Sequence, residues 1–225
     1  MTTQVKLASK AGGELEGALA EPAGAGKVGA LVVLQEWHGL NAQMRGKCDR
    51  FAAEGYLTLV PDLYHGKVAT NDEQAGKLMG ELDWGKAVAE IGDAVAYLRA
   101  HPRSNGKVGV LGFCMGGALA LAASRYVEGL ACVVPFYGVP STPLDEFAKV
   151  KAPIQAHFAK KDDWAKPEKA EQIQAKVKSG GGHMDLFLYD AGHAFMRDDD
   201  PSHYDAEAAK LAWPRALEFL KKHLG

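Results

Sequence analysis

The chain has 225 residues, of which 47% are hydrophobic and 24% are charged, and its formal net charge at pH 7 is −2. This length and composition suit one globular α/β domain, and the absence of a basic stripe argues against a nucleic-acid partner. No stretch reaches the roughly 20 apolar residues of a membrane span, and the N-terminus lacks the apolar region of a signal peptide. We therefore expect a cytoplasmic protein that binds neither nucleic acid nor a membrane.

The cysteine content argues against two further classes. The three cysteines, Cys48, Cys114 and Cys132, are odd in number and far apart, and none belongs to a C-x-x-C pair. A disulfide framework and a zinc site are therefore not expected. We expect neither a metal nor a cofactor.

Strand-like segments recur along the whole chain. QVKLAS and ELEGALAEP flank Gly12 and Gly13 and predict an N-terminal antiparallel hairpin. Further apolar segments predict strands at residues 28–35, 56–61, 107–113, 130–138, 153–159 and 184–190.

Helical patterns lie between these strands, at residues 41–55, 83–102, 116–124, 167–182 and 205–223. Asn41 and Asp83 are expected N-caps, and Pro167 is expected at a first helical position. Pro214 falls inside the last pattern, where it either kinks the helix or starts a second one.

Short apolar strands that alternate with helices indicate βαβ units. Such units build a mostly parallel sheet, here of about eight strands, with helices on both faces. No repeat, low-complexity tract or long linker divides the chain, so we expect one α/β domain over residues 1–225.

The strand predicted at 107–113 runs into GFCMGG, which has the form of G-x-S-x-G with sulfur in place of oxygen. In this motif the nucleophile sits on a strained turn between strand and helix, and a Cβ at the flanking positions would clash. The turn places Cys114 at a helix N-terminus, which favours the thiolate, and leaves the N–H of Met115 free to bind an oxyanion. Cys114 is the candidate nucleophile.

A thiol nucleophile needs a base and an acid that orients the base. KKDDW follows the strand at 153–159 and offers Asp162 and Asp163, whereas AGHAF follows the last strand and offers His193. The order nucleophile, acid, histidine is the one expected for this motif. Because the carboxyl ends of parallel strands meet at one edge, we expect the three groups to lie together.

The loop after the strand at 28–35 completes the candidate site. Its sequence is EWHGL, and the N–H of Trp37 is expected to be the second oxyanion donor. Glu36 stands at the strand tip and would face the same cleft as Cys114.

Together these residues resemble the dienelactone hydrolase family, a cysteine branch of the α/β-hydrolases. The resemblance rests on QEWHG, VPDLY, GFCMGG, PFYG, KDDWAKP and AGHAFMR, which run in order from Gln35 to Arg197. It implies the α/β-hydrolase fold and the hydrolysis of a lactone or ester through a thioester acyl-enzyme. The expected substrate is a small ester or lactone, anionic ones included, and the expected assembly is a monomer or a weak homodimer.

The resemblance also implies roles for individual residues. Cys114 is then the nucleophile and His193 the base. The family's acid stands four residues before a proline, which selects Asp163 over Asp162. Glu36 matches a glutamate that hydrogen-bonds the resting thiol, and Arg197 matches an arginine that binds the substrate carboxylate.

One segment departs from the family pattern. Where the family carries a second arginine and aromatic residues that line the pocket, TNDEQAGKLMGELDW has Asp72, Gly76 and Met79. An acidic residue in place of a basic one argues against the family's anionic substrate. Tyr64 is a candidate to line the substrate pocket instead, as is Trp84.

Several alternatives stay open at this stage. Cys114 would also suit a redox-sensing or ligand-binding thiol without turnover, or a peptidase of the same fold. Glu36 and Arg197 would also suit a structural ion pair. Cys48 and Cys132 are expected to be packing residues, and the histidines other than His38 and His193 are expected mostly at the surface.

Overall fold

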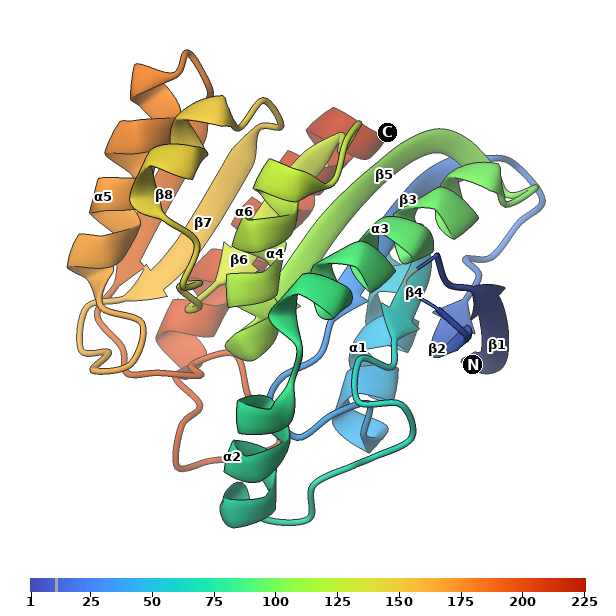
Figure 1. Cartoon of the computed structure of the whole chain (residues 1–225), viewed down its shortest axis with the longest axis horizontal. Helices are drawn as coiled ribbons and strands as arrows, with labels where there is room; N and C mark the ends of the chain where they lie inside the picture. Colours follow the sequence, from blue (N-terminus) through green and yellow to red (C-terminus); the bar gives the residue numbers. More distant parts are fainter. Residues whose placement is uncertain (11) are drawn as a thin grey trace.

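The computed structural model describes residues 1–10 and 12–225. Its centre is a sheet of eight strands in the order β1-β2-β4-β3-β5-β6-β7-β8 (Figure 1). The strands are β1 (Thr3–Ala8), β2 (Glu14–Ala20), β3 (Val28–Leu34), β4 (Leu57–Pro61), β5 (Ser104–Phe113), β6 (Cys132–Phe136), β7 (Ile154–Ala159) and β8 (Met184–Tyr189).

The sheet is mostly parallel. Only the pairs that involve β2 run antiparallel among the described strands, with Leu7 opposite Leu15 in the N-terminal hairpin. From β4 to β8 the neighbouring strands are parallel, as in the register of Val32 with Val110. The predicted hairpin and the predicted mostly parallel sheet are both confirmed.

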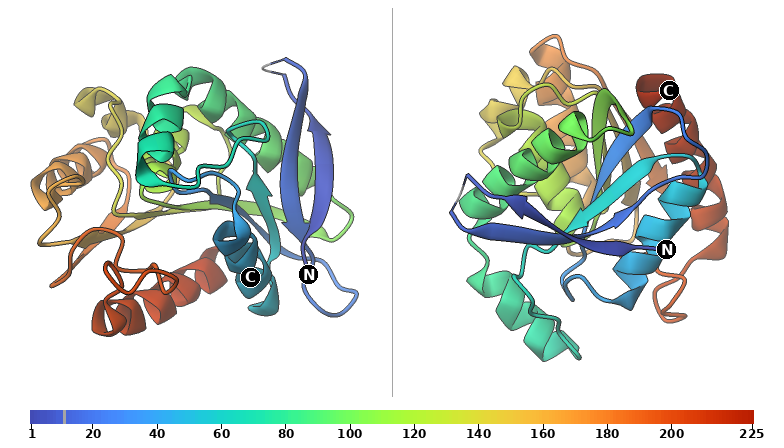
Figure 2. Two further views of the ribbon diagram at one scale, coloured as in Figure 1. Left: turned by 90° about the horizontal axis from the view of Figure 1, so that it is seen from below. Right: turned by 90° about the vertical axis from the view of Figure 1, so that its right-hand side faces the viewer.

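Helices cover both faces of this sheet. They are α1 (Ala42–Ala53), α2 (Asp72–Glu81), α3 (Trp84–Ala100), α4 (Met115–Tyr126), α5 (Pro167–Ser179) and α6 (Ala206–Leu224), with a short 3₁₀ helix η1 (Leu144–Lys149). In Figure 2 α1 and α6 lie on one side of the sheet, and α3, α4 and α5 lie on the other. The side chains of Asn41 and Asp83 cap α1 and α3, and Pro167 opens α5, as predicted.

The core has two halves that the sheet separates. One half joins α3, α4 and α5 to the sheet through residues such as Ile91, Leu119 and Ile173. The other half joins α1 and α6 to it through residues such as Phe51 and Leu220. Central strands with apolar side chains on both faces explain the continuous apolar runs of the sequence.

Two elements lie outside the predicted set, and one alternative is settled. α2 buries only Ala75 fully, and its next apolar residues, Leu78 and Met79, are half-buried against the core. The 3₁₀ helix η1 buries only Phe147. Pro214 lies inside α6, which continues through it as one helix.

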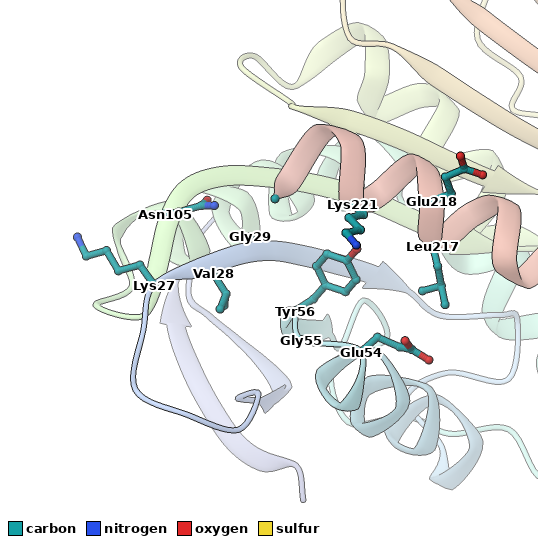
Figure 3. Close-up of a pocket in the computed structure, with 11 residues that line it drawn as sticks. Lys27, Val28, Gly29, Glu54, Gly55, Tyr56, Asn105, Leu217, Glu218 and Lys221 are labelled. Carbon is teal, nitrogen blue, oxygen red and sulfur yellow. The ribbon is translucent and has the colours of Figure 1, made fainter.

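A cavity of about 590 Å³ opens at the amino ends of β3, β4 and β5 (Figure 3). It lies between the C-terminal ends of α1 and α6, and Tyr56 and Leu217 form apolar parts of its lining. None of the candidate site residues lines it, because they lie at the opposite, carboxyl edge of the sheet. Among the described helices, none has the length and hydropathy that a membrane crossing requires.

Candidate active site

Cys114 occupies the single residue between β5 and α4. Its φ of 53° and ψ of −116° belong to a strained conformation that a residue with a Cβ rarely adopts. Its side chain is half-buried, unlike those of the other two cysteines, which are fully buried. The turn therefore presents the sulfur at the carboxyl edge of the sheet, at the N-terminus of α4.

Glycines make this turn possible. A Cβ on Gly112 would collide with the carbonyl oxygen of Gly116, and one on Gly116 would collide with that of Leu34. A Cβ on Gly138, after β6, would collide with the carbonyl oxygen of Cys114 itself. The expected close approach of backbones on both sides of the nucleophile is thus present.

His193 lies in the loop after β8 and contacts both of its expected partners. Its Nε2 is 3.1 Å from Sγ of Cys114, and its Nδ1 is 2.7 Å from Oδ2 of Asp162. Asp162 and Cys114 lie 31 and 79 positions from His193 along the chain, and the fold joins all three in one hydrogen-bonded row.

Asp162, and not the predicted Asp163, is the carboxylate on His193. Oδ1 of Asp162 accepts hydrogen bonds from the N–H groups of Trp164 and Ala165, at 2.8 and 2.9 Å. These bonds turn the Asp162 side chain inward, whereas Asp163 is exposed. The expectation of Asp163 is corrected, because the loop's own hydrogen bonds decide which carboxylate faces the histidine.

The hydrogen bonds of this row favour the charged forms of His193 and Asp162. Burial lowers the pKa of His193, but the hydrogen bonds with Asp162 and Cys114 outweigh it and raise that pKa to about 10. Burial would raise the pKa of Asp162, yet the hydrogen bonds from His193 and from the loop hold it below its usual value. A protonated His193 beside an ionised Asp162 is the arrangement that these directions favour.

Glu36 and Arg197 form the ion pair that the sequence left as an alternative. Arg197 Nε is 3.6 Å from Oε2 of Glu36, and the guanidinium also faces Asp199 at 3.2 Å and Asp200 at 3.6 Å. Glu36 is 4% exposed, and its Oε1 has no hydrogen-bond partner among the described residues. The expected hydrogen bond from the resting thiol to Glu36 is absent from the described part of the chain, since Sγ contacts His193 instead.

The expected oxyanion donors lie at the first residue of α4 and in the loop after β3. Met115 is the first residue of α4, so its N–H has no carbonyl partner within the helix. Trp37 follows β3, and its ring contacts those of His38 and Trp164 at centroid distances of 5.4 and 6.4 Å. Tyr64 is buried, and its hydroxyl lies 3.1 Å from Sδ of Met115, beside the nucleophile.

Sequence reasoning missed two residues beside the site. Lys47 on α1 is buried, and its Nζ is 3.3 Å from the carbonyl oxygen of Met196. Tyr137, with a φ of 34°, packs its ring edge against His193 at 5.3 Å. PFYG was the only signal for Tyr137, whereas Lys47 falls on the apolar side of its helix with Met44 and Phe51.

The other two cysteines and one further histidine are buried in the structure. Cys48 and Cys132 are buried, as expected, and burial raises the pKa of each to about 12. His157 is an exception to the expected surface histidines, since it is fully buried between Tyr189 and Gln155. Within the described residues, no group of three or more His, Cys, Asp or Glu side chains is arranged to hold a metal ion.

Comparison with known proteins finds a matching family and relatives of similar length. The model of the dienelactone hydrolase family matches residues 15–224. A carboxymethylenebutenolidase from a Pseudomonas species is 34% identical over 99% of this chain and 96% of its own length. A putative carboxymethylenebutenolidase from Aquifex aeolicus is 32% identical over 96% of each chain.

A solved structure gives the same fold. A putative dienelactone hydrolase from Klebsiella pneumoniae superposes with a TM-score of 0.88 over 97% of each chain, at 24% sequence identity. At that identity the likeness supports the fold alone, and the sheet with helices on both faces is the α/β-hydrolase arrangement expected from the sequence.

Proposed function

Because this chain belongs to the dienelactone hydrolase family, we propose that it hydrolyses small carboxylic esters or lactones through a thioester on Cys114. The observation that carries the proposal is the row Asp162–His193–Cys114, with contacts of 2.7 and 3.1 Å. Relatives named carboxymethylenebutenolidase support a lactone or ester as the substrate class. The unit of activity in this proposal is one domain over residues 1–225.

The first half of the reaction forms the thioester. The Cys114 thiolate attacks the carbonyl carbon, and the electron pair of the C=O bond moves to its oxygen. The N–H groups of Trp37 and Met115 donate to this oxyanion. When the oxyanion collapses, the C–O bond to the alcohol breaks, and the leaving oxygen takes the proton from Nε2 of His193. In a lactone this alcohol stays attached to the acyl group.

The second half releases the acid. His193, now neutral, takes a proton from a water molecule, which attacks the thioester carbonyl. Collapse of this second oxyanion breaks the C–S bond and regenerates the thiolate beside the imidazolium. Asp162 keeps the Nδ1 proton in place throughout, so that Nε2 is the nitrogen that exchanges protons.

The charges near the site bear on the substrate. Three carboxylates surround Arg197, so its positive charge is already balanced. This arrangement favours the structural ion pair between Arg197 and Glu36. Binding of a substrate carboxylate by Arg197, and of any part of the substrate by Tyr64, stays a prediction.

Loss of the thiol tests the proposal. We expect Cys114→Ala to abolish hydrolysis of 4-nitrophenyl acetate and of an aromatic lactone, while the far-ultraviolet circular dichroism stays that of the wild type. The matched control is Cys132→Ala, which removes a buried thiol and should keep most of the activity. In the wild type, acid quenching followed by mass spectrometry should find the acyl group on Cys114. Full activity of Cys114→Ala would refute the proposal, and labelling without turnover on a broad panel would favour a sensing or binding thiol.

A further inference from the structure

Lys47 is a charged side chain in an unusual place. It lies on α1 and is 7% exposed, although lysine is among the residues least often buried. Its Nζ is 3.3 Å from the carbonyl oxygen of Met196 and 4.4 Å from the centre of the Phe113 ring. A buried ammonium group needs such partners to offset the water that it has lost.

The two contacts of Lys47 belong to the two segments that carry the reacting groups. Phe113 is the last residue of β5 and directly precedes Cys114. Met196 lies in the loop of His193 and directly precedes Arg197. The ammonium group therefore holds the nucleophile turn against the histidine loop, from a helix that belongs to neither.

Lys47 and Glu36 are buried groups of opposite charge, and each favours the charged form of the other. Burial raises the pKa of Glu36, and the charge of Lys47 is the largest effect that opposes this rise, followed by that of Arg197. Burial lowers the pKa of Lys47, and the charge of Glu36 is in turn the largest opposing effect. The other charged groups that act on Lys47 are Asp198 and Asp199 from the histidine loop and Arg50 from its own helix.

We propose that Lys47 is a positioning residue of the cysteine hydrolase described above: it ties the Cys114 turn to the His193 loop and offsets the negative charge of the buried Glu36. The proposal rests on the proposed function for its catalytic meaning. Its electrostatic part can reach the thiol through His193, which interacts with Glu36 and contacts Sγ of Cys114, and it can be tested without turnover.

Charge-altering variants provide the test, with the pH of half-maximal alkylation of Cys114 by iodoacetamide as the readout. The described groups that interact with Cys114 are His193, Tyr64 and Tyr137, and all three are kept. Loss of a positive charge disfavours the thiolate, so Lys47→Met should move the half-maximal pH up by about 0.5 units or more. Glu36→Gln should move it down, and the double variant should return close to the wild type.

Two further variants separate charge from packing. Lys47→Arg keeps the charge and should restore the wild-type profile. Arg45→Met removes a positive charge from the same helix, but Arg45 contacts Gln4 instead of the site, so it should leave the profile unchanged. For ester hydrolysis we expect Lys47→Met to lower kcat by about 10-fold with KM changed less than about twofold, because misalignment of the thiol and imidazole acts on the chemical step.

Each outcome decides the proposal. A Lys47→Met profile that superimposes on the wild type, or a shift that Lys47→Arg does not reverse, would overturn it. If Lys47→Met does not fold, the comparison of Glu36→Gln with the double variant replaces it, and identical profiles of those two would overturn the proposal. If the wild type hydrolyses no ester, the proposed function fails, while the alkylation profiles still decide whether Lys47 offsets Glu36.

Discussion

Asp162 orients His193 with both oxygens of its carboxylate in use. Oδ2 accepts the hydrogen bond from Nδ1 of His193 at 2.7 Å, and Oδ1 accepts from the N–H groups of Trp164 and Ala165. Hydrogen bonds within its own loop thus hold the Asp162 side chain in place in addition to its bond with the imidazole. A carboxylate held in this way sets both the tautomer and the direction of the histidine ring.

This relationship predicts unequal effects at two adjacent positions. Asp162→Asn should lower kcat/KM for 4-nitrophenyl acetate by at least about 100-fold, because an amide cannot stabilise the imidazolium. Asp163→Asn, the matched control, should stay within about twofold of the wild type, since Asp163 is exposed. Steady-state kinetics decides between them, and a larger loss in Asp163→Asn would reverse the assignment.

The three cysteines should differ sharply in reactivity. Cys114 is half-buried beside an imidazole, whereas burial raises the pKa of Cys48 and of Cys132 to about 12. In the native protein at pH 8, we expect iodoacetamide to alkylate Cys114 at least about 100-fold faster than the other two. Peptide mapping checks this, with labelling in denaturant as the control for all three. Equal native labelling of Cys48 would show that the buried thiols open to solvent.

Two glycines in helices should respond in opposite directions to alanine. Gly116→Ala places a Cβ against the carbonyl oxygen of Leu34, so it should lower the free energy of unfolding by about 3 kcal/mol. Gly46→Ala on α1 has open space around the new methyl group and should raise that free energy by about 0.5–1 kcal/mol. Urea denaturation measures both. Equal effects would mean that the backbone at Gly116 moves freely.

The burial of His157 should lower the free energy of unfolding in acid. Burial lowers the pKa of His157 to about 3, below the 6.5 of an exposed histidine, so between these values the unfolded chain binds the extra proton. The contribution of neutral His157 to the free energy of unfolding is therefore complete above pH 6.5. It falls by about 1.4 kcal/mol for each pH unit below that value. His157→Gln should flatten the pH dependence of the unfolding free energy between pH 4 and 6 by that slope. The exposed control, His183→Gln, should not, and an unchanged slope in His157→Gln would contradict the prediction.

Arg197 should matter equally for charged and neutral substrates. Its guanidinium group lies against Glu36, Asp199 and Asp200, so its removal leaves the buried Glu36 carboxylate without its ion-pair partner. We expect Arg197→Ala to lower kcat/KM about 10-fold for a neutral ester and for its carboxylate-bearing analogue alike. A loss confined to the anionic ester would instead establish Arg197 as the group that binds the substrate carboxylate.

The fold was predictable where local signals and burial agree. Asn41, Asp83 and Pro167 mark helix starts through local hydrogen bonding and fixed φ, which need no tertiary contact. α2 was missed because it is a short helix whose apolar pattern consists of Ala75, Leu78 and Met79 among mostly polar residues. The continuation of α6 through Pro214 depends on packing along the whole helix, which the sequence does not display.

The site was predictable where backbone geometry demands particular residues. Cys114 stands out because only glycines fit around its strained turn, and His193 because it follows the last strand. The choice between Asp162 and Asp163 depended on side-chain directions inside one loop. Lys47 could not be placed, because its partner Met196 is 149 residues away and a lysine on a helix is usually solvent-exposed.

α2 buries few side chains in the core, and this affects how readily its residues can be substituted. A helix that gives the core only one fully buried side chain can exchange most of its other residues at little cost in stability, while Cys114, Asp162 and His193 lie on segments that follow β5, β7 and β8. Asp72, which meets His38 beside the Trp37 loop, lies on this helix. Substitutions in residues 72–81 should therefore cost less stability than substitutions in α3, which buries seven side chains fully.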